Sequence, residues 1–316
     1  MTPDEHWALF RADPCATPFQ SPAWVEAWWR HLGAADTGGE RVDVTARDER
    51  GRVVAVLPCF VWTEAGERRL VPLGAGQSDY CDALIDPAAP DAAARLWRAL
   101  AAERWDALWW PDLRDGARLL GAMPSEWRVQ DAPHEICPVL TIPADGDVLG
   151  ALSRSRRRKI VHDRNRAEAL GGVETRLAAA GEVDGALDAL FALHAARWQA
   201  AGEPGVLARP ETQAFLREAA HGLDAAGLLR LAVVRHADAI VAVLLGFCDG
   251  RRGYSYINGT AFVPGQSFGT LAFGALIEAA AVEGACAFHF LRGEEPYKYG
   301  WGAHPTTTVR RVIRRG

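Results

Sequence analysis

The segment from Tyr254 to Ala303 constrains the fold more than any other part of this chain. A strand-like run, Tyr254 to Asn258, leads through a polar turn into the loop 264–270. An alanine-rich helical pattern, 271–282, and a short apolar strand, 285–291, follow. Strand, glycine-containing loop, helix and strand in this order predict an α/β fold in which the loop lies at a helix N-terminus.

The loop before this helix is a predicted anion site. Backbone N–H groups at the start of a helix have no partner within it, and the helix dipole adds positive potential there. A phosphate-bearing carrier is therefore expected to bind Gln266, Ser267, Phe268, Gly269 and Thr270. Ser267 is also a good N-cap residue, and capping is compatible with anion binding.

Acid–base groups follow the last strand of the segment. Glu294, Glu295, Tyr297 and Lys298 are framed by glycines and aromatic residues, which favours a shaped pocket over a solvated loop with one ion pair. Since an amine with a pKa of about 10.4 is almost wholly protonated at pH 7, an acyl transfer to it needs a base. We expect Glu294, Tyr297 and Lys298 to be catalytic, with a carboxylate as base and Tyr297 as proton donor. Which of the two carboxylates faces the pocket stays open.

Composition limits the class of protein. The chain has 316 residues, enough for two domains, with 49% hydrophobic residues and a net charge of −5. The acidic balance argues against broad nucleic-acid binding, and no nucleic-acid partner is expected. No apolar run approaches the ~20 residues of a membrane span, and no secretory signal is visible, so a cytoplasmic location is expected. The six cysteines are scattered without a C-x-x-C pair, so neither a metal site nor disulfides are expected.

The chain reads as two similar halves joined near Ile142–Gly146. The second half has the predicted order β-α-α-β-β-β-α-β-β, with elements at 173–177, 182–201, 211–223, 228–234, 240–247, 253–258, 271–282, 285–291 and 307–313. The first half is a fainter copy, with a Trp-rich helix after Ser21 and elements at 42–46, 53–61, 69–73, 91–103 and 107–110. Asp86 and Asp91 lie near the start of its last helix, where they would repel a polyphosphate. We expect a degenerate domain over residues 1–145 and a domain with the carrier site over residues 146–316.

Four blocks of the chain resemble a known family. They are Phe290–Ala303, Ser78–Asp82, the arginine-rich Ser153–Arg166 and Leu193–Gly205. At these residues the chain resembles the acetyltransferase-6 (BioF2-like) branch of the GNAT superfamily, which includes acetyltransferases associated with bacterial cellulose and exopolysaccharide synthesis. Gln266–Thr270 has part of the glycine-rich loop of that superfamily.

The resemblance implies a tandem GNAT-like acyl-CoA N-acyltransferase fold with mixed sheets and an acceptor cleft between the halves. It implies acetyl-CoA or another acyl-CoA as co-substrate, no metal, and direct attack by an amine or hydroxyl acceptor, such as a small molecule, a sugar or a polysaccharide precursor. Expected acceptor-binding residues are Asp79, Tyr80, His194, Arg197 and Arg292. Asp79-Tyr80 alone would pass for an ordinary Asx turn, and a helix-surface histidine such as His194 is usually inert.

The basic run from Arg154 to Arg166 has several interpretations. It is compatible with a solvated helix, an anionic substrate, the 3′-phosphate of CoA or a membrane surface, and we prefer an anionic acceptor. Two alternatives to a CoA-dependent enzyme stay open. One is an aminoacyl-tRNA-dependent transferase of the kind that builds peptidoglycan bridges, which usually carries a long helical arm that no segment here can form. The other is a non-catalytic binding protein of a polysaccharide pathway. The sequence does not indicate the oligomeric state.

Overall fold

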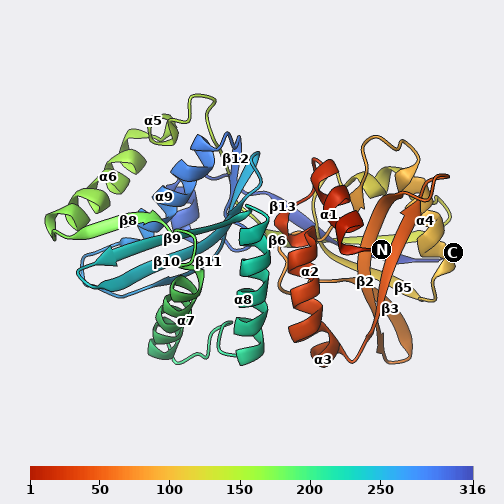
Figure 1. The fold of residues 1–316 in the computed structure, drawn as a ribbon. Coiled ribbons are helices and arrows are strands. Elements are labelled where there is room, and N and C mark those ends of the chain that lie inside the picture. The colour runs from red at the N-terminus through yellow and green to blue at the C-terminus, as the bar shows by residue number, and fades with distance from the viewer. Residues whose placement is uncertain (316) are drawn as a thin grey trace. The chain divides into compact units, whose positions relative to one another are not determined.

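A computed structural model describes residues 1–315 of the chain, which fold into two compact units. Unit 1 comprises Met1–Glu135 and Thr307–Gly316, and unit 2 comprises Ile136–Thr306. Each unit has one mixed sheet covered by helices (Figure 1). Within the described residues, no helix combines the length and the apolar composition needed to cross a bilayer.

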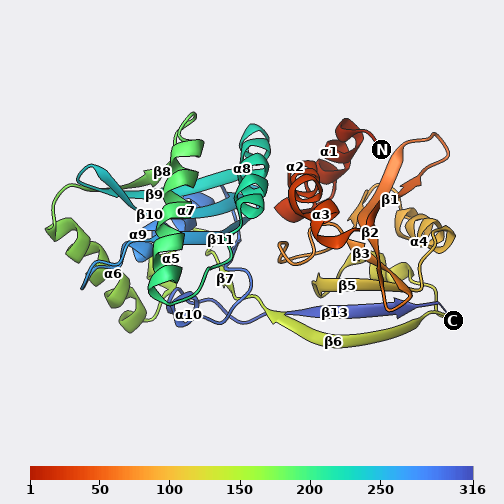
Figure 2. The same ribbon diagram turned by 90° about the horizontal axis from the view of Figure 1, so that it is seen from below.

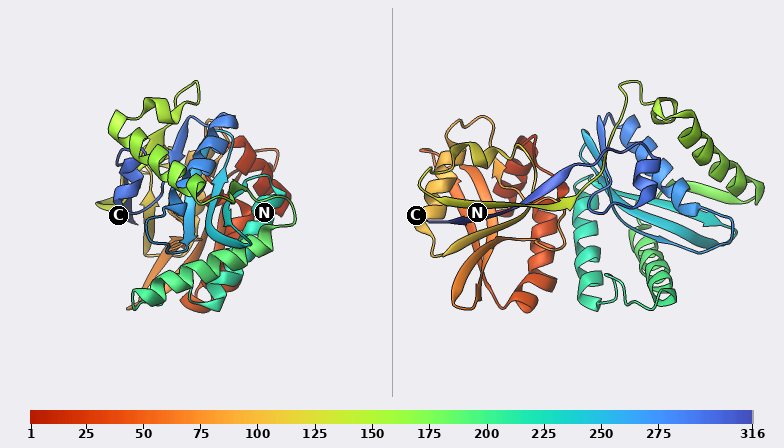
Figure 3. Two further views of the ribbon diagram at one scale, coloured as in Figure 1. Left: turned by 90° about the vertical axis from the view of Figure 1, so that its left-hand side faces the viewer. Right: turned by 180° about the vertical axis from the view of Figure 1, so that it is seen from behind.

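Unit 2 has a six-stranded sheet in the order β7-β12-β11-β10-β9-β8. Its strands are β7 (Val139–Thr141), β8 (Val173–Leu177), β9 (Leu229–His236), β10 (Ala239–Cys248), β11 (Arg252–Thr260) and β12 (Ala287–His289). Its helices are α5 (Val148–Ala151), α6 (Arg154–Ala169), α7 (Val183–Ala200), α8 (Pro210–Ala225), α9 (Phe268–Val282) and α10 (Pro296–Gly300). Helix α9 lies on one face of the sheet with α6 against it, whereas α7 covers the other face (Figures 1 and 3).

The strands β11 and β12 open away from each other. They pair in parallel only at Arg252–Tyr254, opposite Ala287–His289, although β11 continues to Thr260. On the other side of β11, the pairing with β10 shifts register between Leu245 and Gly246, and this bulge bends the strand. The far half of β11 therefore has one edge that β12 does not pair with, and this edge faces the start of α9.

Unit 1 has a seven-stranded sheet in the order β1-β2-β3-β5-β13-β6, with β4 paired to β2. Its strands are β1 (Glu40–Arg47), β2 (Val53–Glu64), β3 (Glu67–Pro72), β4 (Leu84–Ile85), β5 (Ala107–Leu113), β6 (Arg128–Ile136) and β13 (Thr307–Arg314). Its helical segments are α1 (Pro3–Ala12), η1 (Pro18–Gln20), α2 (Pro22–Trp28), η2 (Trp29–Gly33), α3 (Ala34–Thr37), α4 (Ala92–Ala102) and η3 (Arg118–Ala122). As predicted, Ser21 caps α2 by accepting a hydrogen bond from the N–H of Trp24, and Pro22 occupies its first turn.

The two units repeat one topology. The order β1-β2-β3-α4-β5 in unit 1 matches β9-β10-β11-α9-β12 in unit 2, and β3–β5 is a parallel pair like β11–β12. An antiparallel strand then follows the parallel pair in each sheet: β13 beside β5, and β7 beside β12. The tandem α/β fold expected from the sequence is confirmed.

The division between the units differs from the expected boundary after residue 145. The predicted last strand, 307–313, is present as β13, but it lies in the sheet of unit 1, between β5 and β6 (Figure 2). In the second sheet, β7 takes the position beside β12. Alternation predicts that a segment is a strand, but it carries no information on which of two similar sheets that strand joins.

Candidate functional site

A pocket of about 770 Å³ lies in unit 2 beside the unpaired end of β11. Four segments build it: the last turns of α7, the end of β11, the loop 261–267 with the start of α9, and α10 with the residue after it. The lining residues are Leu193, Ala196, Arg197, Ala200, Ala201, Asn258, Thr260, Ala261, Phe262, Val263, Gln266, Ser267, Gly269, Thr270, Phe273, Tyr297 and Trp301.

The predicted anion loop forms one wall of this pocket. Of its five residues, Gln266, Ser267, Gly269 and Thr270 line the pocket, whereas Phe268 is buried and packs its ring on His236. Phe268 and Gly269 are the first residues of α9, so their N–H groups have no carbonyl partner within the helix. No acidic residue lies in this first turn. The N–H groups at this helix start are therefore available to an anion.

Side chains from α6 support the loop. The hydroxyls of Ser267 and Thr270 share a hydrogen bond of 2.8 Å, and Thr270 donates to Asp163 Oδ2 at 3.2 Å. Gly265 has a φ of +75°, and a side-chain carbon there would collide with the Arg166 guanidinium, which lies over the loop. The loop therefore has its conformation fixed by contacts with α6.

Two buried polar atoms of the pocket wall have no hydrogen-bond partner among the described residues. They are Thr260 Oγ1 at the end of β11 and Gln266 Oε1 in the loop. A buried polar atom without a partner costs about 1–3 kcal/mol, so such pairs of atoms mark places where a ligand supplies the missing partners. A ligand with both donors and acceptors fits this wall.

Tyr297 is the predicted catalytic residue that lines the pocket. Its ring contacts Phe273, with centroids 4.9 Å apart, and its side chain is 42% exposed, so the phenol can reach a ligand. Burial of the ring raises the pKa of Tyr297, the nearby Glu295 raises it further, and Arg197 opposes both effects. The phenol therefore keeps its proton through the neutral range and acts as a hydrogen-bond donor.

Lys298 and Glu294 do not line the pocket. Lys298 is 2% exposed, and its Nζ donates to the carbonyls of Leu291 (3.2 Å), Arg292 (2.5 Å) and Gly293 (3.1 Å). It also pairs with Glu295 Oε2 at 2.9 Å. This amine holds the turn before α10, where Leu291 has a φ of +58°, and we assign it a positioning role.

Glu294 is exposed and lies beside Tyr299. Desolvation, and then this carboxylate, raise the pKa of Tyr299. Arg292, expected to bind the acceptor, is half-buried outside the pocket lining, and its carbonyl accepts from Lys298.

His194 and Arg197 are three residues apart on α7, within reach of each other. Arg197 lines the pocket, whereas His194 is 4% exposed and does not. The His194 ring lies 5.9 Å from Trp198, and its Nδ1 has no partner within the described residues. Burial, and then the charge of Arg197, lower the pKa of His194. A side-chain carbon at Gly205 would lie 2.7 Å from Trp198 and 2.8 Å from His194, so the Leu193–Gly205 block packs a loop onto these two rings.

Asp79 and Tyr80 lie in unit 1, where the Ser78–Asp82 segment packs against the end of β5. The N–H of Cys81 donates to the Asp112 carbonyl (3.0 Å), and the Trp110 indole donates to the Cys81 carbonyl (2.7 Å). Asp79 is 4% and Tyr80 2% exposed. The cavity beside this segment measures only about 10 Å³. Asp79 and Tyr80 are therefore packed inside unit 1, and they do not line its larger cavity of about 290 Å³.

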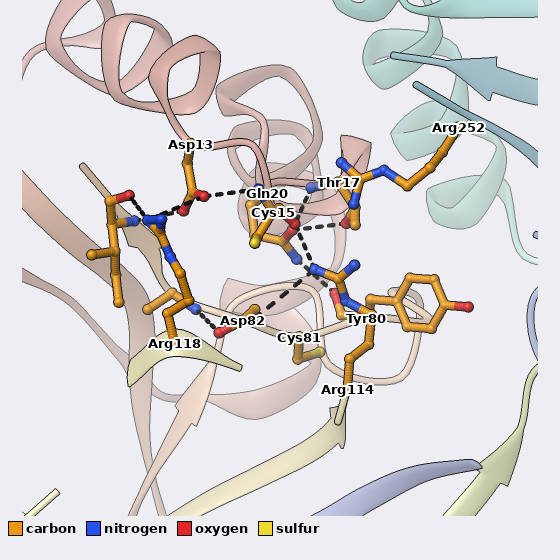
Figure 4. Close-up of polar contacts among 12 residues, drawn as sticks. Asp13, Cys15, Thr17, Gln20, Tyr80, Cys81, Asp82, Arg114, Arg118 and Arg252 are labelled. Carbon is orange, nitrogen blue, oxygen red and sulfur yellow. Dashed lines mark hydrogen bonds and ion pairs between the residues drawn. The ribbon is translucent and has the colours of Figure 1, made fainter. Parts of the chain in front are cut away.

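Charged side chains surround this segment (Figure 4). Asp82 lies 4.0 Å from Arg114, and Asp13 lies 3.4 Å from Arg118. Burial raises the pKa of Asp82 to about 6, an effect that the charge of Arg114 reduces. These ion pairs lie inside unit 1, and the sequence pattern did not predict them.

Much of the pocket wall is formed by residues that the sequence pattern did not predict. Asn258 and Thr260 alternate on β11, and this alternation was a usable signal because residues two apart share a face of a strand. Phe273 and Trp301, in contrast, looked like ordinary core residues. Their place at the pocket depends on how α9 and α10 meet.

Comparisons with known proteins agree with this geometry. Residues 154–299 match the family model described as an acetyltransferase (GNAT) domain. No curated protein sequence matches the chain. FemX is structurally similar over 99% of this chain and 96% of its own, with a TM-score of 0.67 and 12% identity. A conserved protein of unknown function from Bacteroides thetaiotaomicron covers 99% of this chain and 98% of its own, with a TM-score of 0.63 and 12% identity.

A third solved structure is the C-terminal domain of a putative lysylphosphatidylglycerol synthetase from Agrobacterium fabrum. It covers 99% of this chain and 92% of its own, with a TM-score of 0.59 and 11% identity. At these identities the likeness concerns the fold. The chain thus has a tandem GNAT-like α/β fold, in which residues 154–299 match the model of a GNAT acetyltransferase domain.

Proposed function

We propose that unit 2 transfers an acyl group from acyl-CoA to an amine or hydroxyl acceptor. The observation that carries this proposal is the pocket beside β11, where the open start of α9 meets two unpartnered polar atoms, Thr260 Oγ1 and Gln266 Oε1. The helix start suits the pyrophosphate of CoA, and the two atoms suit the amide groups of its pantetheine arm. A cytoplasmic location is part of this proposal.

The protein residues have defined tasks in this reaction. Gln266, Ser267, Gly269 and Thr270 would hold the carrier, which supplies the thioester when bound. The acceptor nitrogen or oxygen forms a bond to the acyl carbonyl carbon, the C–S bond breaks, and the thiolate takes up a proton. Tyr297 donates a hydrogen bond to the leaving sulfur, because its raised pKa keeps the phenol protonated.

A base must take up the proton that the amine or hydroxyl loses when it attacks the thioester. Since Glu294 does not line the pocket, water in the pocket or the buried His194, on the same helix as the lining residues Leu193 and Arg197, is the better candidate. The low pKa of His194 leaves the imidazole neutral at pH 7 and able to accept a proton. The resemblance to the BioF2-like branch supports a sugar or polysaccharide precursor as acceptor.

Calorimetry with acetyl-CoA, followed by detection of released CoA thiol in the presence of candidate acceptors, tests this function. We expect saturable binding, and thiol release that depends on the acceptor. Binding without transfer to any acceptor would favour a non-catalytic binding protein.

A second candidate is transfer of an aminoacyl group from a charged tRNA. It is favoured by the similarity over nearly the whole chain to FemX and to a lysylphosphatidylglycerol synthetase, whose product carries a lysyl group. In residues 1–315 the longest helix is α7, with 18 residues, so no long helical arm is present. Transfer from aminoacyl-tRNA in the absence of any acyl-CoA binding would decide for this candidate.

A further inference from the structure

The pocket extends beyond the residues that we assign to the carrier. Its volume of about 770 Å³ lies in the upper part of the range of about 300–1,000 Å³ that is typical of pockets for drug-sized molecules. An acetyl group has only two carbon atoms. The lining residues of α7 and α10 are not among those assigned to the carrier, so they are available to a transferred group larger than acetyl.

The walls of the pocket are mainly apolar. Arg197 is the one charged residue among its described lining residues. Phe273, Tyr297 and Trp301 form an aromatic wall, in which the Phe273 and Tyr297 rings are 4.9 Å apart. Burial of apolar surface is favourable in proportion to its area, whereas a charged or sugar-like group would lose hydration here with few partners.

Helix α7 contributes small side chains to the pocket. Ala196 and Ala200 are one turn apart, and both are exposed and line the pocket together with Ala201. Larger residues at these positions would occupy the space that the alanines leave. The width of the pocket thus depends on three side chains of one helix end.

An unusually exposed aromatic residue lies at the pocket's opening. Phe262 lines the pocket and is nevertheless 92% exposed, more than any other large hydrophobic residue described as exposed. An apolar group that passes this ring on its way into the pocket would cover it.

We propose that the pocket receives an acyl chain longer than acetyl, carried by the donor thioester. This inference rests on the proposed function and specifies its donor. The chain would lie between α7 and the aromatic wall, with Phe262 at its entrance.

The test is calorimetry of the full chain with CoA, acetyl-CoA, hexanoyl-CoA and octanoyl-CoA. Each buried methylene should tighten binding roughly fourfold, which corresponds to about 0.8 kcal/mol per CH₂. We expect octanoyl-CoA to bind at least about tenfold more tightly than acetyl-CoA, since part of the chain stays exposed. Ala196→Trp should reduce the ratio of the two affinities to below about threefold, by filling the pocket.

A matched control is Ala192→Trp, on the exposed face of α7 outside the pocket, which should leave this ratio unchanged. Equal affinities for acetyl-CoA and octanoyl-CoA would overturn the inference and leave the proposed function standing. The inference would also be overturned if 1-octylamine binds while acetyl-CoA, hexanoyl-CoA and octanoyl-CoA bind with equal affinity. The apolar group in the pocket would then be part of the acyl acceptor and not of the donor. If no CoA compound binds, the proposed function and this inference both fall.

Discussion

Gly269 is the second residue of α9, and it faces Thr260 with room for a side chain. A Cβ atom there would lie 3.6 Å from Thr260 Oγ1, an ordinary contact distance. We predict that Gly269→Asp abolishes CoA binding in calorimetry, because it adds a negative charge where the phosphates would approach. The neutral Gly269→Asn has nearly the same shape and should retain most of the affinity. Equal affinities of the two variants and the wild type would remove the carrier from this loop.

Tyr297 lines the pocket, whereas Glu294, three residues earlier in the same segment, is exposed and does not line it. Once an acceptor is known, Tyr297→Phe should lower kcat by about tenfold, less than the ~10²–10⁴ of a full general acid, because a thiolate leaves tolerably without a proton donor. Glu294→Gln should change kcat by less than about twofold, since its carboxylate is outside the pocket lining. The reverse pattern, measured at saturating donor, would restore Glu294 as the base predicted from the sequence.

Asp82 should make the stability of unit 1 depend on pH. Its pKa in the folded chain is about 6, against an ordinary value of 3.8. The folded state thus binds a proton that the unfolded state has released, so the stability from this group is full below pH ~4 and is lost as pH rises through ~6. Asn cannot ionise, so we predict that Asp82→Asn reduces the loss of folding free energy between low and neutral pH by up to about 2–3 kcal/mol. Urea unfolding at pH 4 and pH 7.5 tests this, and an unchanged difference between the two conditions would contradict it.

Among the elements, β13 provides a test of the division into units. Ile313 is fully buried in the core of unit 1, together with Leu70, Leu108 and Trp110. Ile313→Ala should therefore destabilise unit 1 by about 2–5 kcal/mol, whereas Arg310→Ala, at an exposed position of the same strand, should cost less than about 0.5 kcal/mol. Hydrogen exchange resolved along the chain should show faster exchange in β5 for Ile313→Ala. Faster exchange confined to β12 would instead place the strand with unit 2.

The sequence predicted individual elements better than their assembly. Helix α7 and strand β8 lie within one residue of the predicted ranges. Val173–Leu177 has β-branched residues at alternate positions, Val173 and Thr175, and follows two glycines, and Glu182–Ala201 is long and rich in helix formers. The Gln266–Thr270 loop was found because a helix start has a local signature. Contacts between distant residues are not encoded in local patterns. Such contacts determine the placement of β13, the packing of Ser78–Asp82 against β5 and the burial of Lys298.

At the scale of the whole molecule, the repeated topology raises the question of how many carriers one chain binds. Unit 2 has a pocket of about 770 Å³ at the start of α9, whereas a cavity of about 290 Å³ in unit 1 is not lined by the start of α4. We predict a stoichiometry of one CoA per chain in equilibrium dialysis. A value near two, or binding that survives Gly269→Asp, would mean that unit 1 also carries a site.

The position of β13 in the first sheet has a consequence for synthesis on the ribosome. Residues 1–135 emerge first, but β5 has an unpaired edge until Thr307–Arg314 has been translated. At about 5–20 residues per second, the intervening unit 2 takes roughly 10–30 s to synthesise. Nascent chains would therefore expose the Ala107–Leu113 edge during that interval, which makes this strand a natural target for chaperones. The domain that is translated first would be the last to complete its sheet.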